Sequence, residues 1–296
     1  MRLPLSLLFA LSFSGLVHAQ EAQPDEAAKV EAFLASLNFQ QGRVALPEAK
    51  AVLNLPSDFR FLNAADAERV LSEYWGNPPG SDAIGMLVPA AIPLSDNERS
   101  WAIVLQYQDD GYVSDEDAKE INYQKLLQEM QESTRESNDA RRQQGYGTVE
   151  LVGWAEPPRY DGASHKLHWA KELAFDGEAQ HTLNYDVRVL GRSGVLVMRA
   201  VAGMGQLGDI KPGMAQAIEA VDFEPGARYA DFNADTDRVA EYGLAALVAG
   251  GIAAKTGLLS KLLALLLAAK KLVVVAVGAI AVGIGKLFGK KKAEGE

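Results

Sequence analysis

Cysteine is absent from the 296 residues. The chain can therefore form no disulfide, carry no thiol nucleophile or thiolate metal site, and receive no lipid anchor on a cysteine. Histidine is scarce, with four residues. The sequence also lacks a G-x-S-x-G elbow, a P-loop, a dinucleotide fingerprint and an H-E-x-x-H pair, the short motifs that most directly indicate catalysis. We therefore predict no catalytic residue, no metal site and no cofactor.

The chain as a whole has no net positive charge, and its local excess of basic residues lies at the C-terminal end. The formal net charge is −10, but residues 20–243 carry −17 and residues 244–296 carry +6. Proteins that bind nucleic acid gain much of their affinity by neutralising phosphates, so a nucleic-acid partner is not expected. An acidic body followed by a basic, apolar tail indicates a soluble domain tethered to a membrane.

Residues 1–19 predict a secretory signal peptide. Arg2 precedes an apolar run over residues 3–17, and the small residues Val17 and Ala19 stand at −3 and −1 of a cut before Gln20. The alternative is a retained N-terminal membrane helix, for which about 20 apolar residues are needed. Cleavage is the favoured prediction because this run is shorter.

The C-terminal region predicts a membrane anchor. Residues 272–288 form an apolar run of 17 residues with lysines at both ends, which predicts a short transmembrane helix, and residues 289–296 form a basic tail. Residues 243–271 are apolar but contain Lys255 and Lys261, which favours an amphipathic segment in the membrane interface. The alternative is a membrane hairpin that turns at Lys270 and Lys271. With one span, the body lies on the periplasmic or extracellular side of a bacterial cell membrane.

Residues 20–229 predict an acidic, exported α+β domain, and residues 230–242 predict a polar linker. Extended runs joined by tight turns indicate a mainly antiparallel sheet with packed helices. In residues 182–190, Leu183, Tyr185, Val187 and Val189 alternate onto one face. The other predicted elements are a hairpin over 43–46 and 51–55, a helix over 64–75 capped by Asn63, a helix from Ser114 to about 144, a strand over 195–202 and a short helix near 210–220.

Six runs and the apolar tail carry a resemblance to a known family. The runs are residues 55–62, 75–80, 85–89, 110–113, 153–160 and 169–172. They resemble an uncharacterised family of predicted membrane-anchored bacterial proteins, classed as a domain of unknown function. The resemblance covers nearly the whole mature chain and implies anchoring, but it supplies no catalytic residue. The order of a late strand pair, a helix and a short last strand is also similar to that of photosystem PsbP-like binding modules, an analogy of order that does not give a function.

Two stiff, proline-bearing segments are the candidate binding sites. Residues 154–161 (Trp-Ala-Glu-Pro-Pro-Arg-Tyr-Asp) and 75–80 (Trp-Gly-Asn-Pro-Pro-Gly) are predicted to be loops that are candidates to meet in space. In the structural alternative, each is a rigid connection with packed aromatic rings and an ion pair between Glu156 and Arg159. The candidate binding residues are Trp154, Glu156, Arg159, Tyr160, Trp75 and Asn77.

Two other clusters were weighed as metal sites. Residues 109–117 are acidic, but an EF-hand reading places Gln106 and Gln108 where carboxylates are required, so a solvated turn and helix cap is favoured. His165, His168 and Glu172 lie in a predicted strand, where positions i and i+3 point to opposite faces and cannot share an ion.

Three functions remain open on the sequence. The favoured one is a non-enzymatic, membrane-anchored binding or assembly module, with the lipid bilayer as one partner and an envelope protein as a candidate second. The alternatives are an envelope hydrolase that uses Glu156, Asp161 or Asp109 as acids, and a membrane-active protein that acts through its C-terminal tail.

Overall fold

The computed structural model describes residues 24–77, 79–96, 98–143, 145 and 147–250. The chain divides into two compact units, Met1–Val248 and Ala249–Glu296, and everything below belongs to the first except residues 249 and 250. The predicted signal peptide 1–19, transmembrane helix 272–288 and basic tail 289–296 lie outside the described residues, as does most of the predicted amphipathic segment. Within the described ranges, no helix is both long and apolar enough to cross a membrane.

A seven-stranded antiparallel sheet forms the centre of the first unit. Its strand order is β3-β4-β5-β9-β8-β7-β6. This confirms the predicted α+β class with a mainly antiparallel sheet. The strands are β3 (Phe59–Asn63), β4 (Gly85–Pro89), β5 (Ile103–Gln108), β6 (Val149–Asp161), β7 (Lys166–Phe175), β8 (Thr182–Leu190) and β9 (Val195–Gly203).

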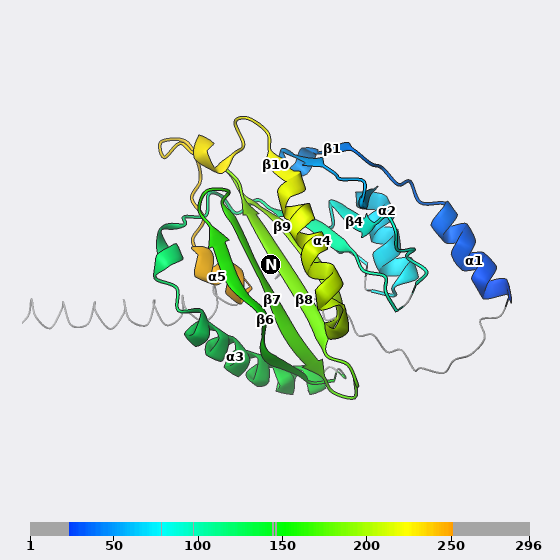
Figure 1. Ribbon diagram of the computed structural model, residues 1–296. Helices are drawn as coiled ribbons and strands as arrows, with labels where there is room; N and C mark the ends of the chain where they lie inside the picture. Colours follow the sequence, from blue (N-terminus) through cyan, green and yellow to red (C-terminus); the bar gives the residue numbers. More distant parts are fainter. Residues whose placement is uncertain (1–23, 78, 97, 144, 146, 251–296) are drawn as a thin grey trace, which may run out of the picture. The chain divides into compact units, whose positions relative to one another are not determined.

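The first face of this sheet is covered by a helix and by a small second sheet. Helix α4 (Leu207–Ala220) crosses the face over β8 and β9 (Figure 1). The second sheet is antiparallel in the order β1-β2-β10, and it includes the predicted hairpin. Its strands are β1 (Arg43–Leu46), β2 (Ala51–Asn54) and β10 (Val221–Phe223), and the short 3₁₀ turn Pro47–Ala49 joins the first two.

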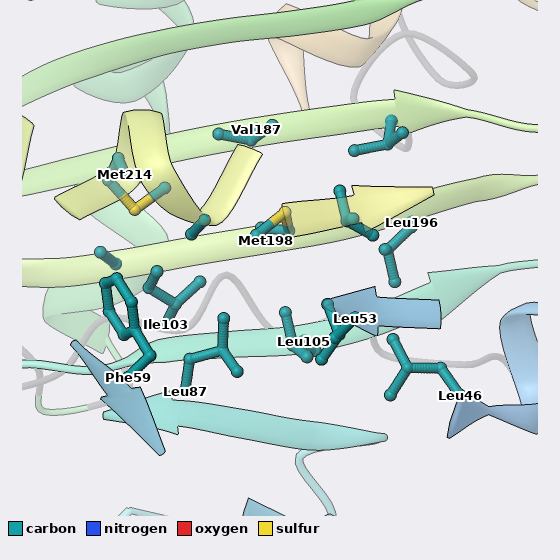
Figure 2. Close-up of a cluster of buried hydrophobic side chains, with 14 of the residues drawn as sticks. Leu46, Leu53, Phe59, Leu87, Ile103, Leu105, Val187, Leu196, Met198 and Met214 are labelled. Atoms are coloured by element: carbon teal, nitrogen blue, oxygen red, sulfur yellow. The ribbon is translucent and has the colours of Figure 1, made fainter. Parts of the chain in front are cut away.

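The main hydrophobic core lies between the first face and these covering elements. Figure 2 shows Leu53 of β2, Leu105 of β5, Met198 of β9 and Met214 of α4 in one cluster, and all four are fully buried. The four residues predicted to share one face of β8 belong to the same core. Burying a side chain of this size contributes about 1.5–3 kcal/mol, so this layer supplies much of the free energy of folding.

The opposite, second face carries two separate hydrophobic clusters. At the β3–β4 end, α1 (Pro24–Ala35) and α2 (Ala64–Arg69), with its π-helical continuation Val70–Tyr74, pack around Leu62 and Met86. Asn63 caps α2 as predicted, because its Oδ1 accepts a 2.9 Å hydrogen bond from the Asp66 amide. At the β6–β7 end, α3 (Tyr123–Gln143) and α5 (Leu244–Ala249) pack near Leu167 and Trp169.

The acidic stretch 109–117 does not start the long helix. A 3₁₀ turn, Glu116–Lys119, comes first, and α3 begins only at Tyr123. The Asn122 side chain accepts a 3.0 Å hydrogen bond from the Lys125 amide. Asn122 is therefore the N-cap of α3, the role that the sequence predicted for Ser114. The predicted start was therefore about nine residues too early.

Residues 230–242 are not a free linker but pack against the body. The Tyr112 amide donates to the Arg238 carbonyl, and the Ala240 amide donates to the Tyr112 carbonyl, both at 2.8 Å. Arg192 donates through Nε and Nη2 to both oxygens of Asp237, at 2.7 and 2.9 Å. The prediction of a linker was wrong because its polar side chains bind residues far away in the sequence.

Asp117 completes this attachment. Its carboxylate accepts hydrogen bonds from the amides of Leu244 (3.2 Å) and Ala245 (3.3 Å), at the start of α5. Tyr242 also donates a hydrogen bond to Asp110. We call the contact of residues 229–245 with residues 109–117 the C-terminal clamp. It fixes α5, whose Leu244, Leu247 and Val248 are buried.

Because α4 packs closely on the sheet, two of its glycines should respond differently to substitution by alanine. A Cβ added at Gly213 would lie 2.6 Å from the Trp101 ring, whereas nothing lies within 4 Å at Gly208. An alanine normally stabilises a helix by up to about 1 kcal/mol relative to glycine, but overpacking costs about 1–3 kcal/mol. We expect Gly213→Ala to lower the free energy of unfolding by about 1 kcal/mol and Gly208→Ala to leave it unchanged or raise it, as measured by denaturant titration. Equal effects of the two substitutions would contradict this packing.

Candidate functional site

Residues 154–161 form part of strand β6, so the prediction of a loop was wrong. β6 is an edge strand, and its pairing with β7 shifts register between Glu156 and Arg159, on either side of the two prolines. An edge strand with a bulge tolerates proline because the missing N–H groups break no ladder. Trp154 and Tyr160 pack on the second face, as the structural alternative expected.

The carboxylates considered for hydrolysis are each held by a different partner. Glu156 forms an ion pair with Lys211 of α4 at 2.8 Å, in place of the pair with Arg159 that the sequence suggested. Asp161 accepts hydrogen bonds from the Ala163 amide (2.9 Å) and from Ser164 Oγ (2.6 Å), which lowers its pKa and closes the β6–β7 turn. Asp109 pairs with Arg238 at 3.3 Å in the clamp.

Tyr160 belongs to a network beside the clamp. Its hydroxyl donates to Asp115 Oδ2 at 2.6 Å and lies 3.0 Å from His165 Nδ1. Burial alone would raise the pKa of Asp115, but hydrogen bonds from Tyr160 and Tyr229 and the nearby His165 lower it. The His165 ring stacks on Tyr229, with centroids 4.1 Å apart. The network therefore joins the end of β6 to the clamp.

The histidine and acidic candidates do not assemble a metal centre. His165 occupies the turn before β7 with φ +53°, and His168 lies on β7 with its ring parallel to that of Tyr185 in the main core. Glu172 interacts with His181 instead. In the part of the chain that the structure describes, no group of three or more histidine or acidic side chains could hold a metal ion.

Trp75 and Asn77 line a cavity of about 50 Å³ on the second face. Segment 154–161 contributes none of the residues that line it, so the two proline-bearing segments do not form this site together. The remaining lining residues are Leu71, Ser81, Ala102, Val104, Gln106, Arg199 and Val201. The cavity thus lies between the end of α2 and the central strands β5 and β9.

A buried group of charges adjoins this cavity. We call it the Asp186 cluster, and it consists of Lys171 on β7, Asp186 and Arg188 on β8, and Arg199 on β9. Asp186 Oδ1 accepts hydrogen bonds from Arg199 Nε (2.9 Å) and Arg188 Nη1 (3.2 Å), and Lys171 Nζ lies 3.8 Å from Oδ2. Asp186 is 1 % exposed and Arg188 is 4 % exposed. Three cations therefore surround one carboxylate inside the protein.

The register of the sheet explains why these charges meet. Asp186 is directly opposite Arg199 on β9 and Trp169 on β7. Directly opposed side chains on one face of an antiparallel sheet lie about 4.5–5.5 Å apart at Cβ. The Arg188 guanidinium lies over the Trp169 ring at 5.0 Å from its centroid, a cation–π contact. Strand alternation thus places the cluster on the second face, between its two hydrophobic clusters.

The protonation states of Asp186 and Lys171 follow from the excess of positive over negative charge in the cluster. Burial by itself would raise the pKa of Asp186, but Arg199, Arg188 and Lys171 together hold it well below the usual range of an aspartate. Burial lowers the pKa of Lys171, and the two neighbouring guanidinium groups lower it further against the pull of Asp186. Asp186 is consequently ionised at neutral pH.

Trp75 and Asn77 were selected from the sequence as candidate binding residues, whereas Asp186, Arg188 and Arg199 were not. A signal was present: Asp186 and Arg188 alternate with the predicted inward residues of β8, in the middle of a sheet. A charged residue at such a position is expected to be paired if helices cover both faces. The alternation does not indicate whether helices cover the other face, so it provided no reason to select these charges.

A larger and more open cleft lies on the first face. It has a volume of about 510 Å³ and lies between α4 and the ends of β3 and β4. Phe59, Trp101, Asp58 and Asp209 are among the residues that line it. Trp101 Nε1 is buried, and no acceptor for it is present among the described residues. This volume falls in the range of small-molecule sites, but the cleft has no convergent set of charged groups.

Comparison with known proteins identifies the family. A sequence profile for proteins of unknown function, DUF2167, matches residues 38–281. The chain belongs to this family. The family carries no assigned activity, which agrees with the resemblance drawn from the sequence. No curated protein matches the chain.

Solved structures give only weak likenesses. A solution structure of cyanobacterial PsbP from Synechocystis is 9 % identical, with a TM-score of 0.35 over 64 % of this chain and 94 % of that one. The Ran-binding protein Mog1p of Saccharomyces cerevisiae is 11 % identical, with a TM-score of 0.33 over 67 % and 100 %. LpqN of Mycobacterium tuberculosis, described as involved in cell envelope biogenesis, is 15 % identical, with a TM-score of 0.31 over 66 % and 97 %. Nothing about the present chain follows from likenesses this low.

The Asp186 cluster makes a prediction about stability and pH. Asp186→Asn leaves the buried Arg188 and the partly exposed Lys171 and Arg199 without a counter-charge, so we expect it to lower the free energy of unfolding by about 3 kcal/mol at pH 7. The folded pKa of Asp186 lies below the unfolded value of about 3.9. Its ionisation therefore stabilises the fold above about pH 4, and the effect is lost as the pH falls through the folded pKa.

The measurement is denaturant unfolding of both proteins between pH 3 and pH 8. The difference between the wild type and Asp186→Asn should narrow toward pH 3. Asp139→Asn is the matched control, because its side chain is 79 % exposed and pairs with Arg142 on the surface of α3. We expect less than about 0.5 kcal/mol from it at any pH. A small, pH-independent effect of Asp186→Asn would contradict the proposed role of the buried charge.

Proposed function

We propose that the protein is an exported, membrane-anchored binding module without enzymatic activity. Residues 1–19 direct export and are removed, and residues 272–288 cross the bacterial cell membrane once. The body then faces the periplasm or the cell exterior. Support for this topology comes from the short apolar run behind Arg2, from the lysines at both ends of the C-terminal run, and from the acidic body between them.

The observation that carries the anchoring proposal is the C-terminal clamp. A domain tethered by a free linker would leave its last residues solvated. Here Asp117 caps α5, Arg192 holds Asp237 with two hydrogen bonds, and the Tyr112 backbone pairs with residues 238 and 240. The chain thus enters its apolar C-terminal sequence from a point fixed on the body. This packing supports a body that stays folded up to the start of the segment proposed as the anchor.

Binding is favoured over hydrolysis by what the candidate carboxylates contact. Glu156, Asp161 and Asp109 are held by Lys211, by a turn and by Arg238, three separate structural partners. Trp75 and Asn77, by contrast, line a cavity beside a buried excess of positive charge. A preformed cavity with a few convergent polar groups is typical of ligand-binding sites. The partners proposed are the lipid bilayer, a ligand of this cavity and an envelope protein.

Reporter fusions test the topology. Alkaline phosphatase, which is active only after export, is fused after Tyr242 in one protein and after Gly289 in another. A single span predicts activity for the fusion after Tyr242 and none for the fusion after Gly289, since the second reporter would stay inside. The fusion after Tyr242 is the matched control for expression and export. Activity at both positions would favour the membrane hairpin, and no activity after Tyr242 would contradict export.

A further inference from the structure

The Asp186 cluster has more positive charge than its carboxylate can balance. Lys171, Arg188 and Arg199 give three positive charges against one negative charge, a net charge of +2 in a largely buried volume. The second face carries two hydrophobic clusters, and neither includes a residue of the Asp186 cluster. Buried charges are normally paired, because the interior does not solvate them. The imbalance therefore points to an anionic group that comes from outside the cluster.

The hydrogen-bond donors around the cavity are also in excess. Arg199 has a side chain that is 32 % exposed and lines the cavity, and among the described residues only its Nε has an acceptor. Asn77 Nδ2 is buried at the same cavity and has no hydrogen-bond partner in the described structure. Lys171 approaches Asp186 no closer than 3.8 Å. An oxygen acceptor in the cavity would satisfy Arg199 and Asn77, which both line it, whereas Lys171 faces Asp186 Oδ2.

The size of the cavity limits what can enter it. A single water needs roughly 10–15 Å³ of such space, so a cavity of about 50 Å³ holds a group of a few heavy atoms. A carboxylate or a phosphate fits that limit, whereas a nucleotide or a sugar chain does not. Arg is suited to either group, because its planar fork makes two parallel hydrogen bonds to an oxyanion.

Most of the rest of the wall is apolar. Leu71, Trp75, Ala102, Val104 and Val201 line the same cavity as Arg199 and Asn77. These apolar side chains favour a hydrocarbon group, whereas Ser81 and Gln106 add two polar groups to the wall that already donate hydrogen bonds to Glu68 and to the Ser81 carbonyl. A ligand that matches both parts has an anionic head beside Arg199 and its first carbon atoms against these side chains, with the rest of a longer chain outside the cavity.

We propose that this cavity, the Arg199 site, binds the carboxylate or phosphate group of a small amphiphilic molecule. The proposal rests on the function proposed above and names the class of ligand for it. Arg199 supplies two hydrogen bonds to the oxyanion, Asn77 supplies a third, and Lys171 and Arg188 supply charge from behind. A fatty acid and the head group of a lipid phosphate share this chemistry, and the choice of probes separates them.

The test is calorimetric titration of the full-length protein in a non-ionic detergent with four probes: hexanoate, hexyl phosphate, inorganic phosphate and hexanol. We expect one of the two amphiphilic anions to bind tightest, with one site per chain. Inorganic phosphate should bind more weakly, since it lacks the apolar part, and hexanol should bind at least about tenfold more weakly than the best anion, since it lacks the charge. The stronger of the two amphiphilic anions identifies the head group.

Two variants and a control locate the site. Arg199→Gln should weaken binding of the best anion by about tenfold or more. Val201→Phe should abolish it by filling the cavity while leaving all four charges in place, so it decides the matter if Arg199→Gln does not fold. Arg135→Gln is the control, because Arg135 pairs with Glu150 on the exposed side of α3; its affinity should stay within about twofold of the wild type.

The proposal is overturned if hexanol binds as tightly as the anions, if Val201→Phe binds the best anion as the wild type does, or if no anion saturates. This outcome is separable from failure of the proposed function. Absence of anion binding with the single-span fusion pattern would leave an anchored module with a different ligand. Anion binding without export of the fusion after Tyr242 would leave the site and remove the anchoring.

Discussion

The ion pairs of Asp186 are the interaction on which the second face of the sheet depends. Asp186 lies at the centre of β8, opposite Arg199 on β9 and beside Arg188 and Lys171. A hydrophobic centre would have allowed one continuous core on this face. The charges instead divide it into one cluster under α1 and α2 and another under α3 and α5. The cavity lies where the first of these clusters borders Arg199, so the candidate site follows from a charge in the middle of a strand.

Pairing between residues far apart in the sequence also gives some of the body's acidic side chains a structural role. Several of its carboxylates are not merely solvated: Asp110, Asp115 and Asp117 each bind a residue that lies between 45 and 132 positions away. Together they hold residues 229–245 on the body. The acidic stretch 109–117, which does not fit an EF-hand loop, thus binds the segment that precedes the predicted anchor. Its carboxylates form hydrogen bonds within the chain.

Much of the architecture could be predicted from local patterns. The alternation in β8, the hairpin of β1 and β2 and the Asn63 cap were visible because each depends on residues close together in sequence. The second half of β6, residues 154–161, was predicted as a loop because Pro157 and Pro158 are strong loop signals, and only the position of β6 at the sheet edge makes them compatible with a strand. Residues 230–242 were misread for a related reason, since Arg192 and Asp237 are 45 positions apart.

The candidate site also depends on contacts between residues that are far apart in the sequence. Trp75 and Asn77 drew attention through composition, and they do line a cavity. The group that gives the cavity its chemistry, Arg199, could not be selected, because its significance depends on pairing with Asp186 across two strands and on the helices that cover them. A crystal structure of the full-length protein grown with the tighter-binding of hexanoate and hexyl phosphate tests the central claim most directly. The account predicts the oxygens of that anion within about 3 Å of the Arg199 guanidinium and near Asn77 Nδ2, and it would be contradicted by a cavity that holds only water while the cluster keeps its geometry.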